Sequence, residues 1–305
     1  MTRRPRLLRA FGGVLAALVI VVACASPSPR FDATGRRGVE PPTPAGVPDA
    51  TPSRPGAAGG EDLTGKTVVS LTFDDASASQ ATALEMLRSR GMAGTLYVSS
   101  GLVGTSAYYL MWPQTFEAAL EGHDIGGHTV HHENLVKVDL ATARSEVCQD
   151  RAALTALRFG DDEQGQNIGS FAYPEGGTSP EVAKIVADCG YIDARAVGGL
   201  NNPACRQCPY AESIPPHDPF NIRTAPGVSS GTTLADLQAS VVGAEEHGGG
   251  WVPMVFHGIC ATKCTGDNSL APQIFTAFLD WLQQRRDRGT VVRTVDDVMR
   301  SSSRR

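Results

Sequence analysis

Two groups of residues in this chain have the types and spacing needed to hold a metal ion. Asp74 and Asp75 are adjacent carboxylates, and the imidazoles of His128 and His132 are four residues apart. That spacing places two histidines on one face of a helix, where both can reach one cation. A carboxylate and two imidazoles suit zinc and leave a coordination position for water. We therefore predict a catalytic metal site formed by Asp75, His128 and His132, with Zn2+ as the expected ion.

Asp74 adds a group that can accept a proton. Zinc lowers the pKa of a bound water molecule from 15.7 to about 7, and a carboxylate nearby can take the released proton. Asp74 adjoins the predicted ligand Asp75 and is the expected general base. Both groups of residues also have a structural explanation. Aspartates commonly cap the helix that follows them, and histidine pairs with this spacing also occur on helix surfaces.

The segments around these residues alternate between two kinds of pattern, short apolar runs and stretches with helical periodicity. The expected strands are 67–73, 96–98, 124–126, 170–172, 192–197, 251–256 and 291–293, and the expected helices are 79–90, 112–121, 139–157, 180–189, 233–247 and 272–288. Such alternation implies a parallel sheet of about seven strands with helices outside it, in a barrel or a doubly wound sheet. The segment 198–219 interrupts the pattern and is expected to be a structured loop near the site.

Several polar residues follow the expected strands directly. The Asp74-Asp75 pair ends the first strand, and His257 ends a late one. Active-site residues of parallel α/β barrels lie at this end of the strands, although a single histidine there can also be structural. Tyr173 and Pro174 begin a sharp turn after the strand 170–172. Its backbone N–H groups could face the barrel mouth, or the turn could be an ordinary connection.

Four short motifs, taken in order, resemble the signature of the polysaccharide deacetylase family of carbohydrate esterases, also called NodB-like. The motifs are T-F-D-D at 72–75, H-T-x-x-H at 128–132, Y-P-x-G at 173–176 and F-H at 256–257. The resemblance extends over roughly 66–300 and implies a distorted (β/α) barrel of about seven parallel strands. It also implies metal-dependent removal of N-acetyl groups from a cell-surface or extracellular polysaccharide that contains N-acetylglucosamine.

The resemblance also implies a role for each matching residue. The three predicted metal ligands and the predicted base keep their roles, His257 becomes the general acid, and the backbone N–H of Tyr173 helps to hold the oxyanion. Two features of the family are missing. Many members have arginine where this chain has Ala172, and a D-x-x-D-W segment that orients the catalytic histidine is absent. Arg195 could orient Asp74 from a different strand, or it could be a surface residue.

Two other functions remain open. A metal site of this kind also serves an esterase that removes O-acetyl groups from xylan or another glycan. Because an ester depends less on protonation of its leaving group, loss of His257 should impair amide cleavage more. The other alternative is a lipoprotein that binds glycans without catalysis, although the predicted base and metal ligands are all present. The mild net charge of -5, with no long basic stripe beyond the first forty residues, gives no indication of a nucleic-acid partner.

The first 65 residues are expected to serve export. Residues 1–24 resemble a bacterial lipoprotein signal peptide, with arginines near the start, an apolar run over 11–23, and Cys24 at the position that becomes lipidated. Ordinary signal cleavage is the alternative. Residues 25–65 are rich in Pro, Gly and Ala and predict a disordered linker, and 66–300 would be the catalytic domain. We expect a monomeric exported protein, anchored to the cell membrane by a lipid or secreted.

Six of the seven cysteines follow Cys24. An even number in an exported chain favours disulfides, and we expect Cys148 to pair with Cys189. The other four are expected to cluster, either in disulfides or in a structural zinc site. They form a C-x2-C and a C-x3-C motif at 205, 208, 260 and 264.

Overall fold

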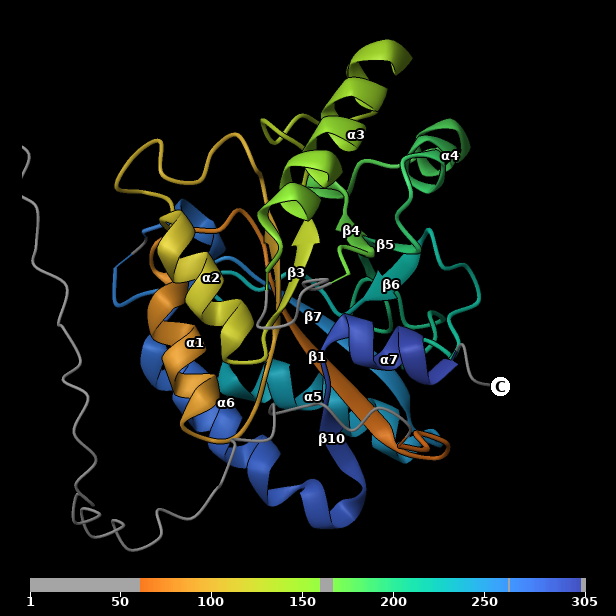
Figure 1. Ribbon diagram of the computed structural model, residues 1–305. Helices are drawn as coiled ribbons and strands as arrows, with labels where there is room; N and C mark the ends of the chain where they lie inside the picture. Colours follow the sequence, from red (N-terminus) through yellow and green to blue (C-terminus); the bar gives the residue numbers. More distant parts are fainter. Residues whose placement is uncertain (1–60, 160–166, 263, 303–305) are drawn as a thin grey trace, which may run out of the picture. The chain divides into compact units, whose positions relative to one another are not determined.

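The computed structural model describes residues 61–159, 167–262 and 264–302 (Figure 1). The predicted signal peptide with Cys24, and most of the predicted linker, lie outside the described residues. No helix in the described part of the chain combines the length and the apolar character that a membrane crossing requires.

The described chain contains one large parallel sheet of eight strands. Its strands are β1 (Thr67–Phe73), β2 (Thr95–Val98), β3 (Asp124–Gly127), β4 (Ser170–Ala172), β5 (Asp193–Gly199), β6 (Ile222–Thr224), β7 (Gly250–Phe256) and β10 (Thr290–Val292). From β1 the order runs through β2, β3, β4 and β5 to β6, while β7 pairs with the other edge of β1. β10 pairs with the first three residues of β1. β2 pairs with the last two residues of β1, along the same edge.

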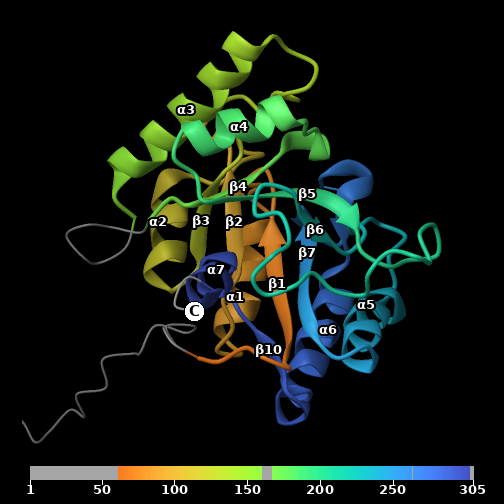
Figure 2. The ribbon, with the colours of Figure 1, turned by 90° about the vertical axis from the view of Figure 1, so that its right-hand side faces the viewer.

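The sheet curls so that the segment after β6 meets β7. The N–H of Ala225 donates to the Pro253 carbonyl at 2.9 Å, and the N–H of Val228 donates to the Val255 carbonyl at 3.0 Å. Closure therefore depends on separate hydrogen bonds beyond the end of a three-residue strand. Figure 2 shows β3, β2, β1 and β7 side by side in the curled sheet. This arrangement confirms the distorted (β/α) barrel with seven parallel strands, β1 to β7, and β10 is an addition at its N-terminal end.

Helices cover the outside of the sheet, as the alternation predicted. They are α1 (Gln80–Arg88), α2 (Trp112–Leu120), α3 (Leu140–Leu157), α4 (Pro180–Asp188), α5 (Leu234–Glu246), α6 (Pro272–Gln284) and α7 (Val295–Ser302). Local signals fix several helix starts: the Asp139 carboxylate accepts from the N–H groups of Ala141 and Thr142, and Thr233 forms a capping box with Asp236. The last predicted helix is too long, because α6 ends at Gln284 and a 3-10 turn follows.

The two faces of β1 fill different spaces. Val69, Leu71 and Phe73 pack in the cluster that includes residues of α1, α5 and α6. Val68 belongs to another cluster with Trp251 of β7 and residues of α7, at the end of the barrel where the strands begin. Asp74 and His257, which directly follow β1 and β7, lie at the opposite end, where the strands finish.

Three disulfides are present in the described chain. Cys148 of α3 pairs with Cys189, which ends α4, as predicted. Cys205 pairs with Cys208, and Cys260 pairs with Cys264. Each short motif is therefore closed on itself, so the zinc alternative for these four cysteines is wrong. The two motifs lie in different loops, and a sulfur atom already bonded to its neighbour is not a zinc ligand.

Candidate active site

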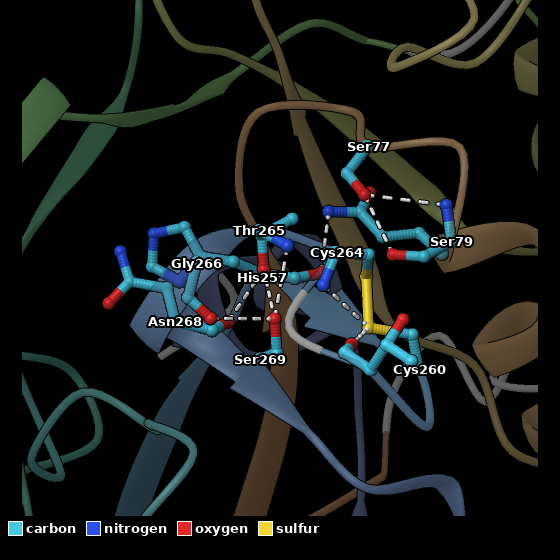
Figure 3. Close-up of a disulfide and its surroundings, with 11 residues drawn as sticks. Ser77, Ser79, His257, Cys260, Cys264, Thr265, Gly266, Asn268 and Ser269 are labelled. Atoms are coloured by element: carbon cyan, nitrogen blue, oxygen red, sulfur yellow. Dashed lines mark hydrogen bonds between the residues drawn. A yellow bond between two sulfur atoms is a disulfide. The ribbon is translucent and has the colours of Figure 1, made fainter.

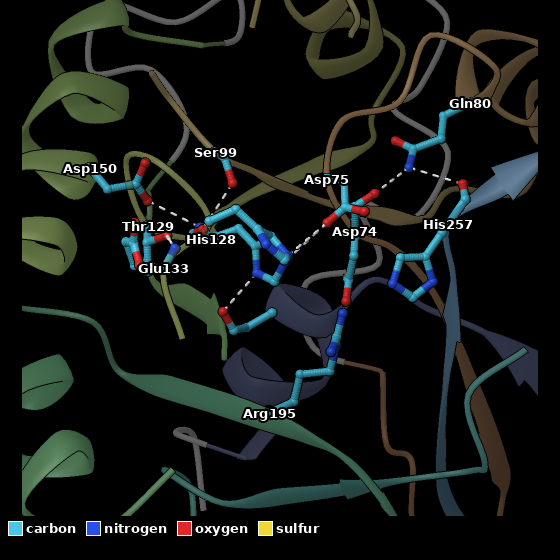
Figure 4. A network of polar contacts seen from close by, with 12 residues as sticks. Asp74, Asp75, Gln80, Ser99, His128, Thr129, Glu133, Asp150, Arg195 and His257 are labelled. Atoms are coloured by element: carbon cyan, nitrogen blue, oxygen red, sulfur yellow. Dashed lines mark hydrogen bonds and ion pairs between the residues drawn. The ribbon is translucent and has the colours of Figure 1, made fainter. Parts of the chain in front are cut away.

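The two adjacent aspartates follow β1 and point to different partners. Asp74 continues the strand, since its N–H donates to the Phe256 carbonyl of β7 at 2.9 Å. Asp75 and Ala76 then have φ values of 73° and 52°, in the left-handed region, so the chain turns sharply. The Asp75 carboxylate faces the histidine loop, whereas the Asp74 carboxylate faces Arg195 (Figure 4). Because of the turn at Asp75, the two adjacent carboxylates point to different partners and can have different roles.

His128 and His132 lie on a loop after β3, so the prediction that they share a helical face is wrong. The loop has left-handed backbone at Thr129, with φ 66°, and at His132, with φ 61°. These two turns bring both imidazoles toward Asp75: Nε2 of His128 lies 3.4 Å from Oδ1, and Nε2 of His132 lies 3.1 Å from it. The three candidate ligand atoms all lie within 4.8 Å of one another. The predicted residues thus converge, but by a different backbone geometry.

The donor set fits a divalent cation. Nδ1 of His128 donates to the Ala172 carbonyl at 2.8 Å, and Nε2 of the same ring faces Asp75. Oδ1 of Asp75 is buried and has no hydrogen-bond partner in the described chain. Burial alone would raise the pKa of Asp75, but the His128 and His132 imidazoles outweigh it and hold this pKa well below its usual range. A carboxylate facing two imidazole nitrogens is suited to a shared cation.

Arg195 reaches the Asp74 carboxylate from β5. Its Nη2 forms an ion pair with Oδ1 of Asp74, and both side chains are almost completely buried. Arg195 stands opposite Ala172 in the β4–β5 register, and its guanidinium lies over the Tyr97 ring at 4.6 Å. The interpretation as a surface arginine is therefore wrong. The guanidinium is supplied one strand away from the position that carries arginine in many family members.

The backbone N–H of Tyr173, which is the predicted oxyanion donor, is hydrogen-bonded within the sheet. Its N–H donates to the Arg195 carbonyl at 3.1 Å, which continues the contact between β4 and β5. In the turn that follows, the N–H groups of Gly176 and Gly177 are bonded to carbonyls of the same turn, and proline has no N–H. Glu175 is the remaining residue of the turn, and its backbone is left-handed, with φ 55°.

His257 follows β7 directly and lies close to Asp74 (Figure 4). Its Nδ1 is buried and has no hydrogen-bond partner among the described side chains and backbone groups. The Cys260–Cys264 loop packs beside it (Figure 3). A Cβ at Gly258 would lie 2.4 Å from Oγ1 of Thr265 and 2.9 Å from Sγ of Cys264, so only glycine fits this approach. The disulfide loop thus packs tightly against the backbone next to the histidine.

Asp150 of α3 supports the histidine loop and was not predicted. Its carboxylate accepts hydrogen bonds from the N–H of Ser100 at 3.0 Å and from the N–H of His128 at 3.1 Å. Burial raises the pKa of Asp150 to about 7, against the opposing effect of these hydrogen bonds. The sequence did hold a signal, because Asp150 lies between the buried residues Val147 and Leu154 on the apolar face of its helix.

The fold and the site together define a class: a (β/α) barrel with a cluster of carboxylates and histidines at the C-terminal ends of its strands. The sequence profile described as polysaccharide deacetylase matches residues 61–193. This match confirms the resemblance to the polysaccharide deacetylase family over that part of the chain.

A curated relative and two solved structures are similar to parts of this chain. A chitin deacetylase from Pestalotiopsis sp is 34% identical over 88 residues, which cover 28% of this chain and 29% of the relative. The Xyl-CE4 domain of a xylanase from the hindgut metagenome of Trinervitermes trinervoides aligns over 78% of this chain and 92% of that chain, with 14% identity and a TM-score of 0.50. Streptococcus pyogenes deacetylase PplD aligns over 52% and 64%, with 23% identity and a TM-score of 0.41. The matches to the curated relative and to PplD thus span less than two thirds of those chains, and the likeness to the Xyl-CE4 domain shows the fold alone.

Proposed function

We propose that the protein is a metal-dependent hydrolase that removes N-acetyl groups from a polysaccharide containing N-acetylglucosamine. One observation carries the proposal: the buried Asp74–Arg195 pair lies directly beside the convergent ligand atoms of Asp75, His128 and His132. A fixed carboxylate next to a candidate cation site is the arrangement that hydrolysis by an activated water molecule requires. We propose Zn2+ as the cation, because the donors are one oxygen and two nitrogens.

Each group of residues in the candidate site would have a separate role in the reaction. A divalent cation held by the three ligands would supply Lewis-acid activation. Asp74 would accept the proton of the attacking water molecule, and Arg195 would keep this carboxylate in position. The N–H of Glu175 would stabilise the oxyanion in place of Tyr173. The turn that contains Glu175 lies beside the histidine loop, since the Glu175 carboxylate accepts from Asn134 at 2.8 Å.

His257 would donate a proton to the leaving nitrogen of the glucosamine unit. An amine is a poor leaving group unless it is protonated, whereas an alcohol leaves from an ester more readily. Replacement of His257 should therefore slow amide cleavage more than ester cleavage. The match to a chitin deacetylase supports an N-acetyl substrate. O-acetylated xylan is the alternative substrate for the same site.

We also propose that the protein works outside the cytoplasmic membrane. Three disulfides within the described chain suit an oxidising compartment. The proposed lipid attachment at Cys24 would keep the catalytic domain at the membrane surface. Mass spectrometry of the mature protein checks this, because an unmodified residue 24, or a mature chain that begins after it, would contradict anchoring.

Acetate release from N-acetylglucosamine oligomers and from acetylated xylan tests the activity. We expect release from the oligomers, loss of release with a chelator, and recovery when Zn2+ is added back. Asp74→Asn should lower kcat by about 10²- to 10⁴-fold, the usual contribution of a positioned general base. Release that persists in the chelator would refute metal dependence, and release from xylan alone would identify an esterase.

A further inference from the structure

Gln80 is the first residue of α1 and is completely buried, although polar residues at helix starts are usually exposed. Its side chain turns back toward the ends of β1 and β7 (Figure 4). Nε2 lies 2.5 Å from the carbonyl oxygen of Asp74 and 3.0 Å from that of His257. A primary amide nitrogen carries two protons, so Gln80 can donate one to each carbonyl at the same time.

The two carbonyls belong to the residues that would act as base and acid. β1 and β7 pair in register over the whole of β1. The bond from the N–H of Asp74 to the Phe256 carbonyl is the last between them, because the chain then turns away at Asp75. Gln80 therefore joins the two strand ends at the point where the backbone ladder stops.

This connection matters most for His257. The Asp74 carboxylate is held by Arg195, but Nδ1 of His257 has no hydrogen-bond partner within the described part of the chain. The position of the imidazole consequently depends on the backbone that carries it. That backbone has two close contacts, the amide of Gln80 at the His257 carbonyl and the Cys260–Cys264 loop packed against Gly258.

We propose that Gln80 is a positioning residue, which fixes the separation between Asp74 and His257 through their backbone carbonyls. This inference rests on the proposed function, in which these two residues exchange protons with water and with the leaving group. Gln80 contacts backbone and lies buried behind the two side chains, so its effect on the reaction is indirect.

Two substitutions in the full chain test the role. Gln80→Leu keeps most of the side-chain volume and removes both donors, and Gln80→Glu keeps the shape but places acceptors against two carbonyls. Because misplacement of reacting groups by 1 Å can cost about 10²-fold in rate, we expect kcat to fall by about that factor in both variants. KM for N-acetylglucosamine oligomers and the affinity for Zn2+ should stay unchanged, since Gln80 touches neither the substrate nor the candidate ligands.

Gln114→Leu is a matched control. Gln114 lies in the first turn of α2, and its Oε1 accepts from the Met111 N–H at 2.8 Å. The control therefore loses a local hydrogen bond at a helix start, and its kcat should equal that of the wild type. A wild-type kcat in folded Gln80→Leu or Gln80→Glu would overturn the proposal. Equal losses in kcat, KM and Zn2+ affinity would also overturn it, because they indicate a general structural role.

A second measurement does not need activity. NMR spectra of protein labelled in histidine, assigned with a His257→Gln variant, report the conformations of the His257 ring. We expect one set of ring signals in the wild type and doubled or broadened signals in the two Gln80 variants. Unchanged ring signals in both variants would overturn the positioning role. If the wild type releases no acetate from any glycan, the proposed function fails while these spectra still decide what Gln80 does.

Discussion

Asp74 and Arg195 form a buried ion pair whose two members depend on each other for stability. Neither side chain is more than slightly exposed. Loss of one partner leaves an uncompensated charge in the interior, which costs far more than the pair contributes as a unit. The same pair would hold the general base in place, so stability and activity should respond together when it is broken.

We expect Arg195→Met to lower the free energy of unfolding by about 3 to 5 kcal/mol, the usual cost of a buried charge left without its partner. Adding Asp74→Asn in the same chain should restore part of that loss, because the unpaired carboxylate is then removed. Urea unfolding of the single and double variants measures both effects, with the exposed Arg206→Met as a control. Losses that simply add would show that the two side chains are not coupled.

His123 should make the fold sensitive to mild acid. Its Nδ1 accepts the Gly94 N–H at 3.0 Å, and burial lowers its pKa from 6.5 to about 4. Folding therefore favours the neutral ring: its contribution is complete above pH 6.5 and is lost as the pH falls through about 4. The loss should reach about 3 kcal/mol.

His123→Asn tests this, because its amide oxygen can still accept the Gly94 N–H but does not titrate. The free energy of unfolding, measured from pH 7 down to pH 4, should fall less steeply in the variant than in the wild type. Equal slopes would show that another group causes the acid sensitivity.

At the scale of elements, the strands and helices were largely predictable because apolar runs and helical periodicity are local signals. β1 and β4 have the predicted limits. β6 was not predicted, since three residues after an irregular loop give no periodicity, and the eight-residue α7 was missed, since two aspartates in its first turn resemble a loop.

The candidate site was less completely predictable than the strands and helices. The types and order of Asp75, His128 and His132 sufficed to predict that they converge, but spacing alone did not distinguish a helix from a loop with two left-handed turns. The partners of Gln80 and Tyr173 depend on neighbouring strands and loops, which no local pattern specifies. The sequence therefore did not predict the contacts between segments that are distant along the chain.

The Cys148–Cys189 disulfide joins α3, which carries Asp150, to the end of α4. Its sequence separation is 41, against 3 for Cys205–Cys208. From the loop lengths we expect paired serine substitutions to cost about 4 kcal/mol for the first disulfide and about 2 kcal/mol for the second. Urea unfolding of the two double variants measures the difference. Equal losses would contradict the loop-length account.

In the described barrel as a whole, the two ends serve different purposes. The C-terminal ends of the strands carry the candidate catalytic groups, while the opposite end is closed by α7 over Trp251. The Trp251 ring is fully buried, and its Nε1 donates to Ser70 Oγ at 2.9 Å. Parallel α/β barrels commonly separate stability from chemistry in this way.

We expect Trp251→Phe to destabilise the protein by about 1 to 3 kcal/mol, through lost packing and loss of the hydrogen bond that Ser70 Oγ accepts, without changing kcat at temperatures where it is folded. His257→Gln should show the opposite, with kcat for amide cleavage lost and the fold retained, because the imidazole Nδ1 has no hydrogen-bond partner in the described chain. Thermal unfolding and acetate release, measured on both variants, check the separation. A large fall in kcat for folded Trp251→Phe would show that the two ends are coupled.

The register between β4 and β5 has an evolutionary consequence. Ala172 and Arg195 stand opposite each other, and the Arg195 guanidinium already pairs with the buried Asp74 carboxylate. Among descendants of a common ancestor, the arginine could change strands only through paired changes at these two positions. Relatives with arginine at the position of Ala172 should therefore carry a small or uncharged residue at the position of Arg195. The residue types at the two positions should change together, so related sequences could be grouped by whether β4 or β5 carries the arginine.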